Sequence, residues 1–239
     1  MPPLAPPPAD QLSATELLRM ALEQYGVDLW FACGFTVEDI VLLHMASSFG
    51  VTPSAFFVDT GRHFEETYQI ADDVRRIMGI EVRWVFPASH DLDDVLARDG
   101  ATTITSDTAC RRRCCEVRRL GPARRALEGA RAWVVGARRT QTTIRQTLAA
   151  VEESPATYGL PRYAPLADWR FGEVVNYARA KKLPFHALYR RGFMSIGCAP
   201  CTAAPRPGEA ERAGRWPFEQ EVEREAGQHL SGIWPGGKP

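Results

Sequence analysis

The sequence predicts an α/β protein with a mostly parallel sheet and helices on both faces. Between residues 13 and 135, short apolar segments of strand length alternate with longer segments of helical periodicity. Such alternation is typical of parallel strands joined by helical crossovers. Ligands bind such sheets at the carboxyl ends of the strands, so we expect a site in the loops that follow them.

The elements can be placed in order along the chain. A capping box from Ser13 to Glu16 begins a first helix, because apolar residues follow it at helical spacing. Short apolar runs predict strands at 28–33, 54–58, 81–86 and 131–135. Helices are expected at 37–47, 64–78, 92–98 and 111–128. From about residue 183 the chain is rich in Gly, Pro and Arg, so we expect an irregular segment over the active site.

Composition narrows the class of protein. The chain has 239 residues, 45% of them hydrophobic, which is enough for one sizeable domain. Lys and Arg number 29, and so do Asp and Glu, which argues against a partner such as nucleic acid or a membrane surface. The proline-rich residues 1–10 show no signal peptide and predict a disordered tail on a cytoplasmic protein. We expect an α/β domain over 11–205 and an active-site tail over 206–239.

Four cysteines in two tight groups are the most informative feature. Cys114 and Cys115 are adjacent, and Cys198 and Cys201 are separated by two residues. Thiolates are soft ligands, which favours zinc or an iron–sulfur cluster over magnesium or calcium. Structural zinc usually takes paired ligands two to four residues apart, so the adjacent pair favours a cluster. Buried or disulfide-bonded cysteines are the alternative.

Two of the expected loops carry groups suited to a nucleotide. In 33–39, Gly34 permits close approach of a ligand, and the following helix start offers N–H groups to an anion. The loop from Asp59 to Arg62 supplies a carboxylate, a hydroxyl and a guanidinium. Either loop is also compatible with an ordinary turn, the second with a helix cap.

Arginines gather in two further segments. Arg138, Arg139 and Arg145 follow the fourth expected strand, where guanidinium groups suit bidentate binding of phosphate or sulfate. A solvated run of charge is the competing interpretation. Arg212 and Arg215 lie in a segment with little core of its own, so we expect it to be ordered by closing over a ligand.

Together these motifs resemble the assimilatory adenylyl-sulfate (APS) reductases, relatives of the phosphoadenylyl-sulfate (PAPS) reductases. The resemblance extends from about Asp28 to His229. Its most specific parts are Cys114-Cys115 with Arg118-Arg119, and the segments 195–202 and 207–216. The segments 59–62 and 165–169 match as well.

The resemblance implies a fold, a cofactor and a set of site residues. The fold would be the adenine-nucleotide α-hydrolase-like sheet, and Cys114, Cys115, Cys198 and Cys201 would hold one [4Fe–4S] cluster. Arg119 would lie between cluster and substrate, where the family has a lysine. The substrate-binding residues implied around the adenosine and the phosphosulfate are Gly34, Phe35, Thr36, Glu38, Asp39, Asp59, Thr60, Gly61, Arg62, Gly136, Arg138, Arg145, Arg212 and Arg215, with His229.

The implied reaction reduces APS to sulfite and AMP. In the family, a cysteine of a mobile C-terminal motif attacks the sulfur and displaces AMP, and thioredoxin or glutaredoxin releases sulfite from the S-sulfocysteine. The cluster is not thought to carry the electrons. The four cysteines point to APS, whereas the branch that lacks them uses PAPS, and a PAPS reductase is left open as an alternative. Relatives often form dimers or tetramers, so a homo-oligomer is left open.

One departure from the family bears directly on activity. Ala226 occupies the position of the nucleophilic cysteine, and a methyl group cannot attack sulfur. Loss of a nucleophile costs roughly 10⁶ in rate in a well-studied hydrolase, so the chain as written is expected to be silent. Cys110 is the one plausible stand-in. Gln228 and Ala203 also depart from the pattern, and the loss is compatible with engineering or with natural divergence.

Two other classes of protein stay open at this point. One is a non-catalytic protein that binds APS or AMP. The other is a zinc-stapled enzyme of the wider nucleotide-hydrolase-like group, although the missing serine-rich pyrophosphate loop counts against an enzyme that uses ATP.

Overall fold

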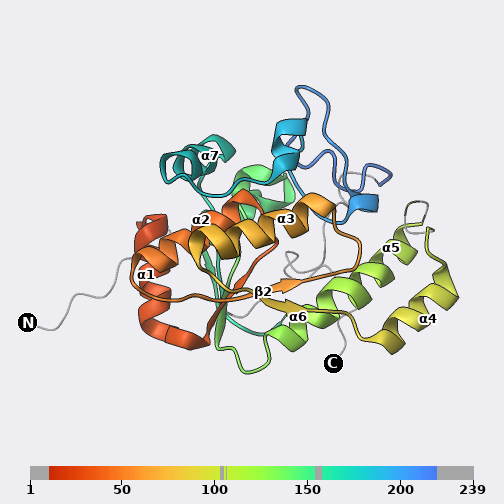
Figure 1. The fold of residues 1–239 in the computed structure, drawn as a ribbon, viewed down its shortest axis with the longest axis horizontal. Coiled ribbons are helices and arrows are strands. Elements are labelled where there is room, and N and C mark those ends of the chain that lie inside the picture. The colour runs from red at the N-terminus through yellow and green to blue at the C-terminus, as the bar shows by residue number, and fades with distance from the viewer. Residues whose placement is uncertain (1–10, 103–104, 106, 154–157, 220–239) are drawn as a thin grey trace, which may run out of the picture.

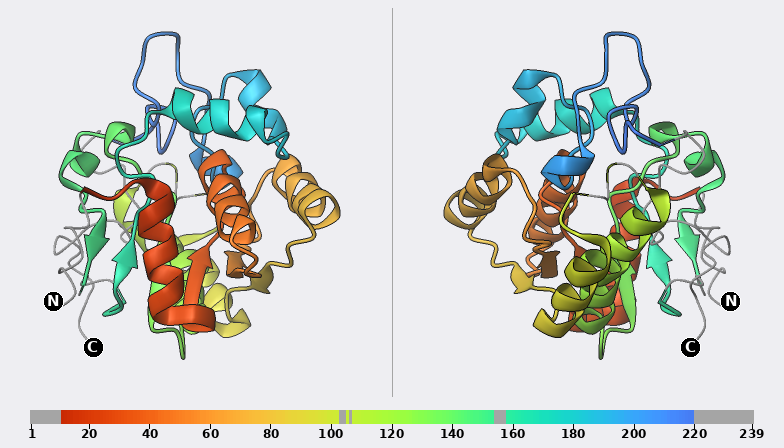
Figure 2. Two further views of the ribbon diagram at one scale, coloured as in Figure 1. Left: turned by 90° about the vertical axis from the view of Figure 1, so that its left-hand side faces the viewer. Right: turned by 90° about the vertical axis from the view of Figure 1, so that its right-hand side faces the viewer.

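The computed structural model describes residues 11–102, 105, 107–153 and 158–219. Its sheet has six strands in the order β3-β2-β1-β4-β6-β5. All neighbouring strands pair in parallel except β5 and β6, which are antiparallel. Helices lie on both sides of the sheet (Figure 1, Figure 2). The predicted fold class is confirmed.

The strands are short and the helices are longer. The strands are β1 (Leu29–Ala32), β2 (Ser54–Val58), β3 (Arg83–Val85), β4 (Ala132–Val134), β5 (Val151–Glu152) and β6 (Arg162–Tyr163). The α-helices are α1 (Ala14–Tyr25), α2 (Val37–Ser48), α3 (Glu65–Asp73), α4 (Ser89–Asp99), α5 (Thr108–Cys115), α6 (Gly121–Ala126) and α7 (Phe171–Ala180). π-helical turns extend α3 as η3 (Val74–Met78) and join α5 to α6 as η5 (Glu116–Leu120).

Strand register decides which side chains share a face. Phe31 pairs with Ala55 and with Val134, so these residues point to the same side of the sheet. The helices α2 and α3 cover one face, and α6 covers the other, where Arg83 donates a hydrogen bond to the Ala126 carbonyl (Figure 1). The strand order reverses between β1 and β4, because the chain continues from β1 to β2 on one side and from β4 to β5 and β6 on the other. This switch point is where an open α/β sheet binds its ligands.

The four predicted strands and the predicted helices are present, with boundaries shifted by a few residues. The helix expected over 111–128 is divided into α5, η5 and α6. The sequence did not predict β5, β6 or α7. The first two have two residues each, which is too short to show alternation, and their pairing depends on partners distant in sequence.

The segment that follows α7 is irregular, as expected. Its regular turns among the described residues are the 3₁₀-helices η8 (Ala187–Arg191) and η9 (Ala199–Cys201). Figure 2 shows this segment, coloured cyan to blue, beyond one end of the strands. The expected tail 1–10 and residues 220–239 of the expected C-terminal tail lie outside the described residues. In the described part of the chain, no helix combines the length and apolar character needed to cross a bilayer.

Candidate active site

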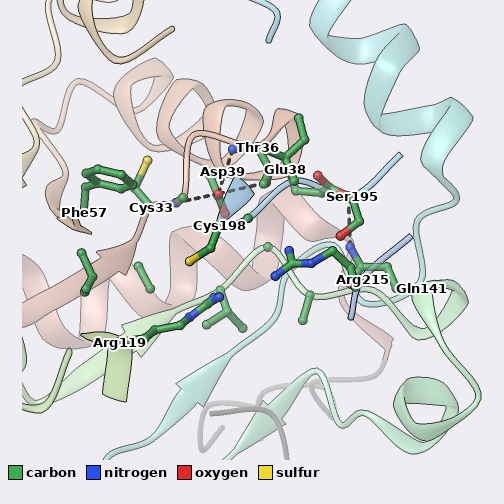
Figure 3. A pocket seen from close by; sticks show the side chains of 18 of the residues that line it. Cys33, Thr36, Glu38, Asp39, Phe57, Arg119, Gln141, Ser195, Cys198 and Arg215 are labelled. Carbon is green, nitrogen blue, oxygen red and sulfur yellow. Dashed lines mark hydrogen bonds between the residues drawn. The ribbon is translucent and has the colours of Figure 1, made fainter. Parts of the chain in front are cut away.

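A cavity opens at the carboxyl edge of the sheet, at the switch point between β1 and β4. Its walls come from the loops after β1, β2 and β4, from η5, and from the segment after α7 (Figure 3). Most of the predicted site residues reach it. Those that line it are Gly34, Thr36, Glu38, Asp39, Thr60, Arg119, Gly136, Arg145, Cys198, Arg212 and Arg215.

The start of α2 is capped from within the chain. The Asp39 carboxylate accepts hydrogen bonds from the backbone N–H of Gly34 at 2.8 Å and of Thr36 at 3.1 Å. The N–H of Val37 donates to the Tyr189 hydroxyl at 3.1 Å. The expectation that this helix start offers these N–H groups to an anion is therefore wrong, because Thr36 and Asp39 form a capping box. An anionic group of a ligand needs another partner in the cavity.

The loops after β1 and β4 touch at glycine. A Cβ on Gly136 would lie 2.7 Å from the Cβ of Glu38 and 2.8 Å from the Asp39 carboxylate, so no larger residue fits there. Phe35 has a φ of 56° and is not among the residues that line the cavity. Its ring is 1% exposed and lies 4.9 Å from the Phe57 ring. Phe35, predicted as a substrate-binding residue, is a core residue in this structure.

Burial of Asp39 makes the stability of the fold depend on pH. Burial, together with the neighbouring Glu38, raises the pKa of Asp39 to about 6. A carboxyl whose pKa is higher in the folded protein takes up a proton on folding, so the free energy of unfolding falls as pH rises from about 4 to about 6. We expect Asp39→Asn to reduce the fall in the free energy of unfolding over this pH range by up to about 3 kcal/mol. Urea unfolding at a series of pH values measures it.

The control for this prediction is Asp72→Asn, on the exposed surface of α3. Asparagine at position 39 keeps one acceptor oxygen for the Gly34 N–H, so the helix cap is retained in part. Equal pH slopes for the Asp39→Asn variant and the unmodified chain would contradict the assignment.

The loop after β2 is held mostly by its own contacts. The Asp59 carboxylate accepts the Gly61 N–H at 2.8 Å and the Tyr68 hydroxyl at 3.1 Å. Arg62 donates to the carbonyl of Ala101 at 2.8 Å. Of the four residues predicted here to bind substrate, Thr60 lines the cavity, and the other three shape the turn that presents it.

The four predicted cluster cysteines lie together. Cys114 and Cys201 form a small buried group with Trp216, separate from the main core, and Cys198 packs against it. Proximity of the Cys198 thiol is one reason why the pKa of Cys115 is raised to about 11, after burial, which is the larger cause. All described cysteines are free thiols, which removes the disulfide alternative for the described part of the chain.

The surroundings of these thiols fit an iron–sulfur cluster. The Thr60 hydroxyl lies 3.2 Å from the Cys198 sulfur. The buried Trp216 indole N–H has no hydrogen-bond partner among the described residues, so it is an orphaned donor beside a group of sulfurs. Within the described ranges, no three His, Cys, Asp or Glu side chains converge on a single metal ion. The fit to a cluster therefore rests on the grouped thiols and on the unpartnered indole N–H beside them.

Cationic side chains converge on the cavity beside Cys198. Arg119 reaches it from η5 and Arg215 from the segment after α7 (Figure 3). Arg215 is 3% exposed, and its guanidinium has no carboxylate partner among the described residues. Burial, and then the nearby Arg119, lower its pKa, while the thiols of Cys198, Cys201 and Cys115 act in the opposite direction. A buried arginine without a carboxylate is a costly arrangement unless an anion completes it.

Arg138 behaves differently from the other predicted arginines. Its side chain is 0% exposed and does not line the cavity. Its guanidinium lies between two carboxylates, with Nε 2.9 Å from Glu38 and Nη2 2.5 Å from Glu211. In this structure Arg138 is therefore occupied by protein partners, and direct contact with a phosphosulfate is not what its geometry favours.

Two predicted site residues lie outside the described part of the chain, and three residues that line the cavity were not predicted from the sequence. Ala226 and His229 lie outside the described residues. His63, Trp133 and Tyr158 line the cavity but were not predicted. His63 directly follows the predicted loop that ends at Arg62, and Trp133 lies in the predicted strand 131–135, so their place beside those loops is the signal that could have found them. Tyr158 follows no element that the sequence predicted.

Comparisons with known proteins agree with this geometry. The family model described as the phosphoadenosine phosphosulfate reductase domain matches residues 14–204. The adenosine 5'-phosphosulfate reductase of Burkholderia cepacia is 36% identical over 232 residues, which are 97% of this chain and 92% of that protein. The corresponding protein of Allochromatium vinosum is 36% identical over 222 residues, with shares of 93% and 86%.

Solved structures support the fold. A phosphoadenylyl-sulfate reductase from Candida auris superposes with a TM-score of 0.69 at 24% identity, covering 81% of this chain and 92% of that one. An FMN adenylyltransferase from Candida glabrata gives 0.57 at 15% identity, with coverage of 83% and 64%. The expected adenine-nucleotide α-hydrolase-like fold is thus confirmed. On the family match and the identity to its relatives, the chain belongs to the phosphoadenosine phosphosulfate reductase family.

Proposed function

We propose that this chain binds adenosine 5'-phosphosulfate (APS) in the cavity and is the scaffold of a thioredoxin-dependent APS reductase of sulfate assimilation. The observation that carries the proposal is Arg215, a buried cation that lines the cavity without a carboxylate partner among the described residues. Because Ala226 stands at the nucleophile position, the chain as written is proposed to bind APS without reducing it.

The cavity has two kinds of lining residue, arginines and glycines, which would bind different parts of the ligand. The arginines Arg119, Arg212 and Arg215 lie where a doubly charged phosphosulfate gains charge-assisted hydrogen bonds. The same groups stabilise the negative charge that develops on AMP as it leaves. The glycines Gly34 and Gly136 allow the rest of the nucleotide to lie close to the backbone at the switch point.

A [4Fe–4S] cluster held by Cys114, Cys115, Cys198 and Cys201 is part of the proposal. When bound, such a cluster adjusts the charge around the substrate and orders the site. Arg118 supports that arrangement, since its guanidinium donates to the Thr60 carbonyl at 2.8 Å while the Thr60 hydroxyl faces Cys198. The relatives named above and the four cysteines favour APS over PAPS as the ligand.

Isothermal titration calorimetry of the anaerobically purified chain tests the binding step. We expect one APS or AMP to bind per chain, and Arg215→Met to weaken AMP binding about 10- to 100-fold by removing a charged hydrogen-bonding group. Arg76→Met, on the exposed surface beyond α3, is the control and should bind AMP as the unmodified chain does. Absence of a binding signal for both APS and AMP would overturn the proposal, and tighter binding of PAPS would overturn its choice of substrate.

A further inference from the structure

A short segment from Glu211 to Glu219, here called the strap, carries two of the cavity arginines. It has almost no regular secondary structure, apart from a bridge between Arg215 and Thr202. The side chains of Arg212 and Arg215 extend from the strap and line the cavity. An irregular segment holds such side chains in place only where specific contacts fix its ends.

The first contact joins the start of the strap to α2 and to the loop after β4. Glu211 receives a hydrogen bond of 2.5 Å from Arg138, and Arg138 also donates to Glu38 in α2 at 2.9 Å. Arg138 side-chain exposure is 0%, against 18% for Glu211. Burial acts to lower the pKa of Arg138, but the Glu38 and Glu211 carboxylates outweigh it and raise the pKa, so Arg138 stays charged. Arg138 thus links α2, the loop after β4 and the strap.

The second contact fastens the end of the strap to the helix that bears two of the cysteines. Arg111 of α5 donates to both carboxylate oxygens of Glu219, each at 2.7 Å. Both side chains are 1% exposed. Trp216 lies between the two contacts in the sequence, with its ring 4.9 Å from the Arg111 guanidinium and 4.7 Å from that of Arg215.

The two contacts restrict where Arg215 can lie. Its guanidinium lies against Gly197, where an added Cβ would lie 2.3 Å from its Nη atoms. Buried ion pairs contribute little net stability compared with apolar packing, but they fix geometry because neither charge tolerates separation. A contact at each end of nine residues therefore has more effect on the position of the arginines than on the stability of the fold.

We infer that Glu211, through Arg138, and Glu219, through Arg111, are positioning residues that hold Arg212 and Arg215 against the phosphosulfate. This inference rests on the proposed function, because it takes the anion of the ligand to lie at those two arginines. It predicts that loosening the strap weakens recognition of the phosphate group specifically, while the nucleoside part of the cavity, formed by other loops, keeps its affinity.

The test compares AMP with adenosine by calorimetry on the full chain, purified anaerobically. Glu211→Gln leaves Arg138 its second carboxylate, Glu38, so no buried charge is left alone and the variant should fold. We expect its affinity for AMP to fall about tenfold and its affinity for adenosine to change less than about twofold. Glu211→Asp, which keeps the charge, should recover part of the lost affinity. Asp73→Asn removes an exposed ion pair with Arg76 and should change neither affinity.

A merely structural role for Glu211 would lower the affinities for AMP and adenosine together, or would lower neither, and either result overturns the inference. A second variant, at the other end of the strap, keeps the inference testable if Glu211→Gln fails to fold. Arg111→Met combined with Glu219→Leu replaces the buried pair by apolar side chains, which proteins often tolerate, and it should show the same selective loss for AMP. Failure of the unmodified chain to bind AMP would instead overturn the proposed function.

Discussion

Changing Ala226 to cysteine is expected to turn a chain that releases no sulfite from APS into one that does. The rest of the binding site is already present, because the cavity, its arginines and the grouped thiols lie at one edge of the sheet. A thiolate at this position would attack the sulfur, and the bond between sulfur and the phosphate oxygen would break to release AMP. Reduced thioredoxin would then free sulfite and become oxidised. The expected gain is on the order of 10⁶, the effect of a nucleophile in a well-studied hydrolase.

The measurement is sulfite release from APS under anaerobic conditions with thioredoxin, for both forms of the chain. Ala204→Cys is the matched control, since it adds an exposed thiol to the same C-terminal part of the chain without placing it at position 226. Sulfite from Ala204→Cys at the same rate would mean that any new thiol suffices. No sulfite from an iron-replete Ala226→Cys protein, with either APS or PAPS, would favour a protein that binds the nucleotide without reducing it.

Replacing Cys198 with serine is expected to remove most of the bound iron and sulfide. Cys198 packs against Cys114, Cys201 and Trp216, and its sulfur faces the Thr60 hydroxyl. A serine hydroxyl is a poor substitute for a soft thiolate ligand of iron. Iron and sulfide analysis, together with the visible absorption of the purified protein, measures the loss.

Cys110→Ser provides the control for this prediction. Cys110 is buried in α5 close to the cysteine pair, but its thiol faces Arg113, at 3.1 Å, rather than the other thiols. This variant should retain the full complement of iron. Retention of iron by Cys198→Ser, or stoichiometric zinc without sulfide in the unmodified chain, would contradict the proposed cluster.

The sequence was most informative where a local pattern and a chemical preference coincide. The strands β1 and β2 were predictable because short apolar runs end at glycine-containing turns. The four cysteines were predictable as one group because few other arrangements explain two tight pairs of thiols, and the structure brings them together. Each of these signals needs only a few neighbouring residues.

The sequence was least informative where the partner of a side chain is distant along the chain. Arg138 was predicted to meet the phosphosulfate, yet Glu38 and Glu211 occupy it from about a hundred residues before and about seventy after. The N–H groups at the start of α2 were expected to face an anion, but Asp39 and Tyr189 take them. A composition rich in arginine does not show which guanidinium groups are already paired.

The most direct test of a reductase scaffold that lacks only its nucleophile is the intact mass of the Ala226→Cys protein after incubation with APS and no reductant. The expected result is one SO₃ added per chain, located at position 226 by peptide mapping, with release of AMP and removal of the adduct by reduced thioredoxin. The unmodified chain should gain no mass. An Ala226→Cys protein that binds APS but gains no SO₃ would contradict the proposal, because the site would then fail to present the sulfur to a thiol at that position.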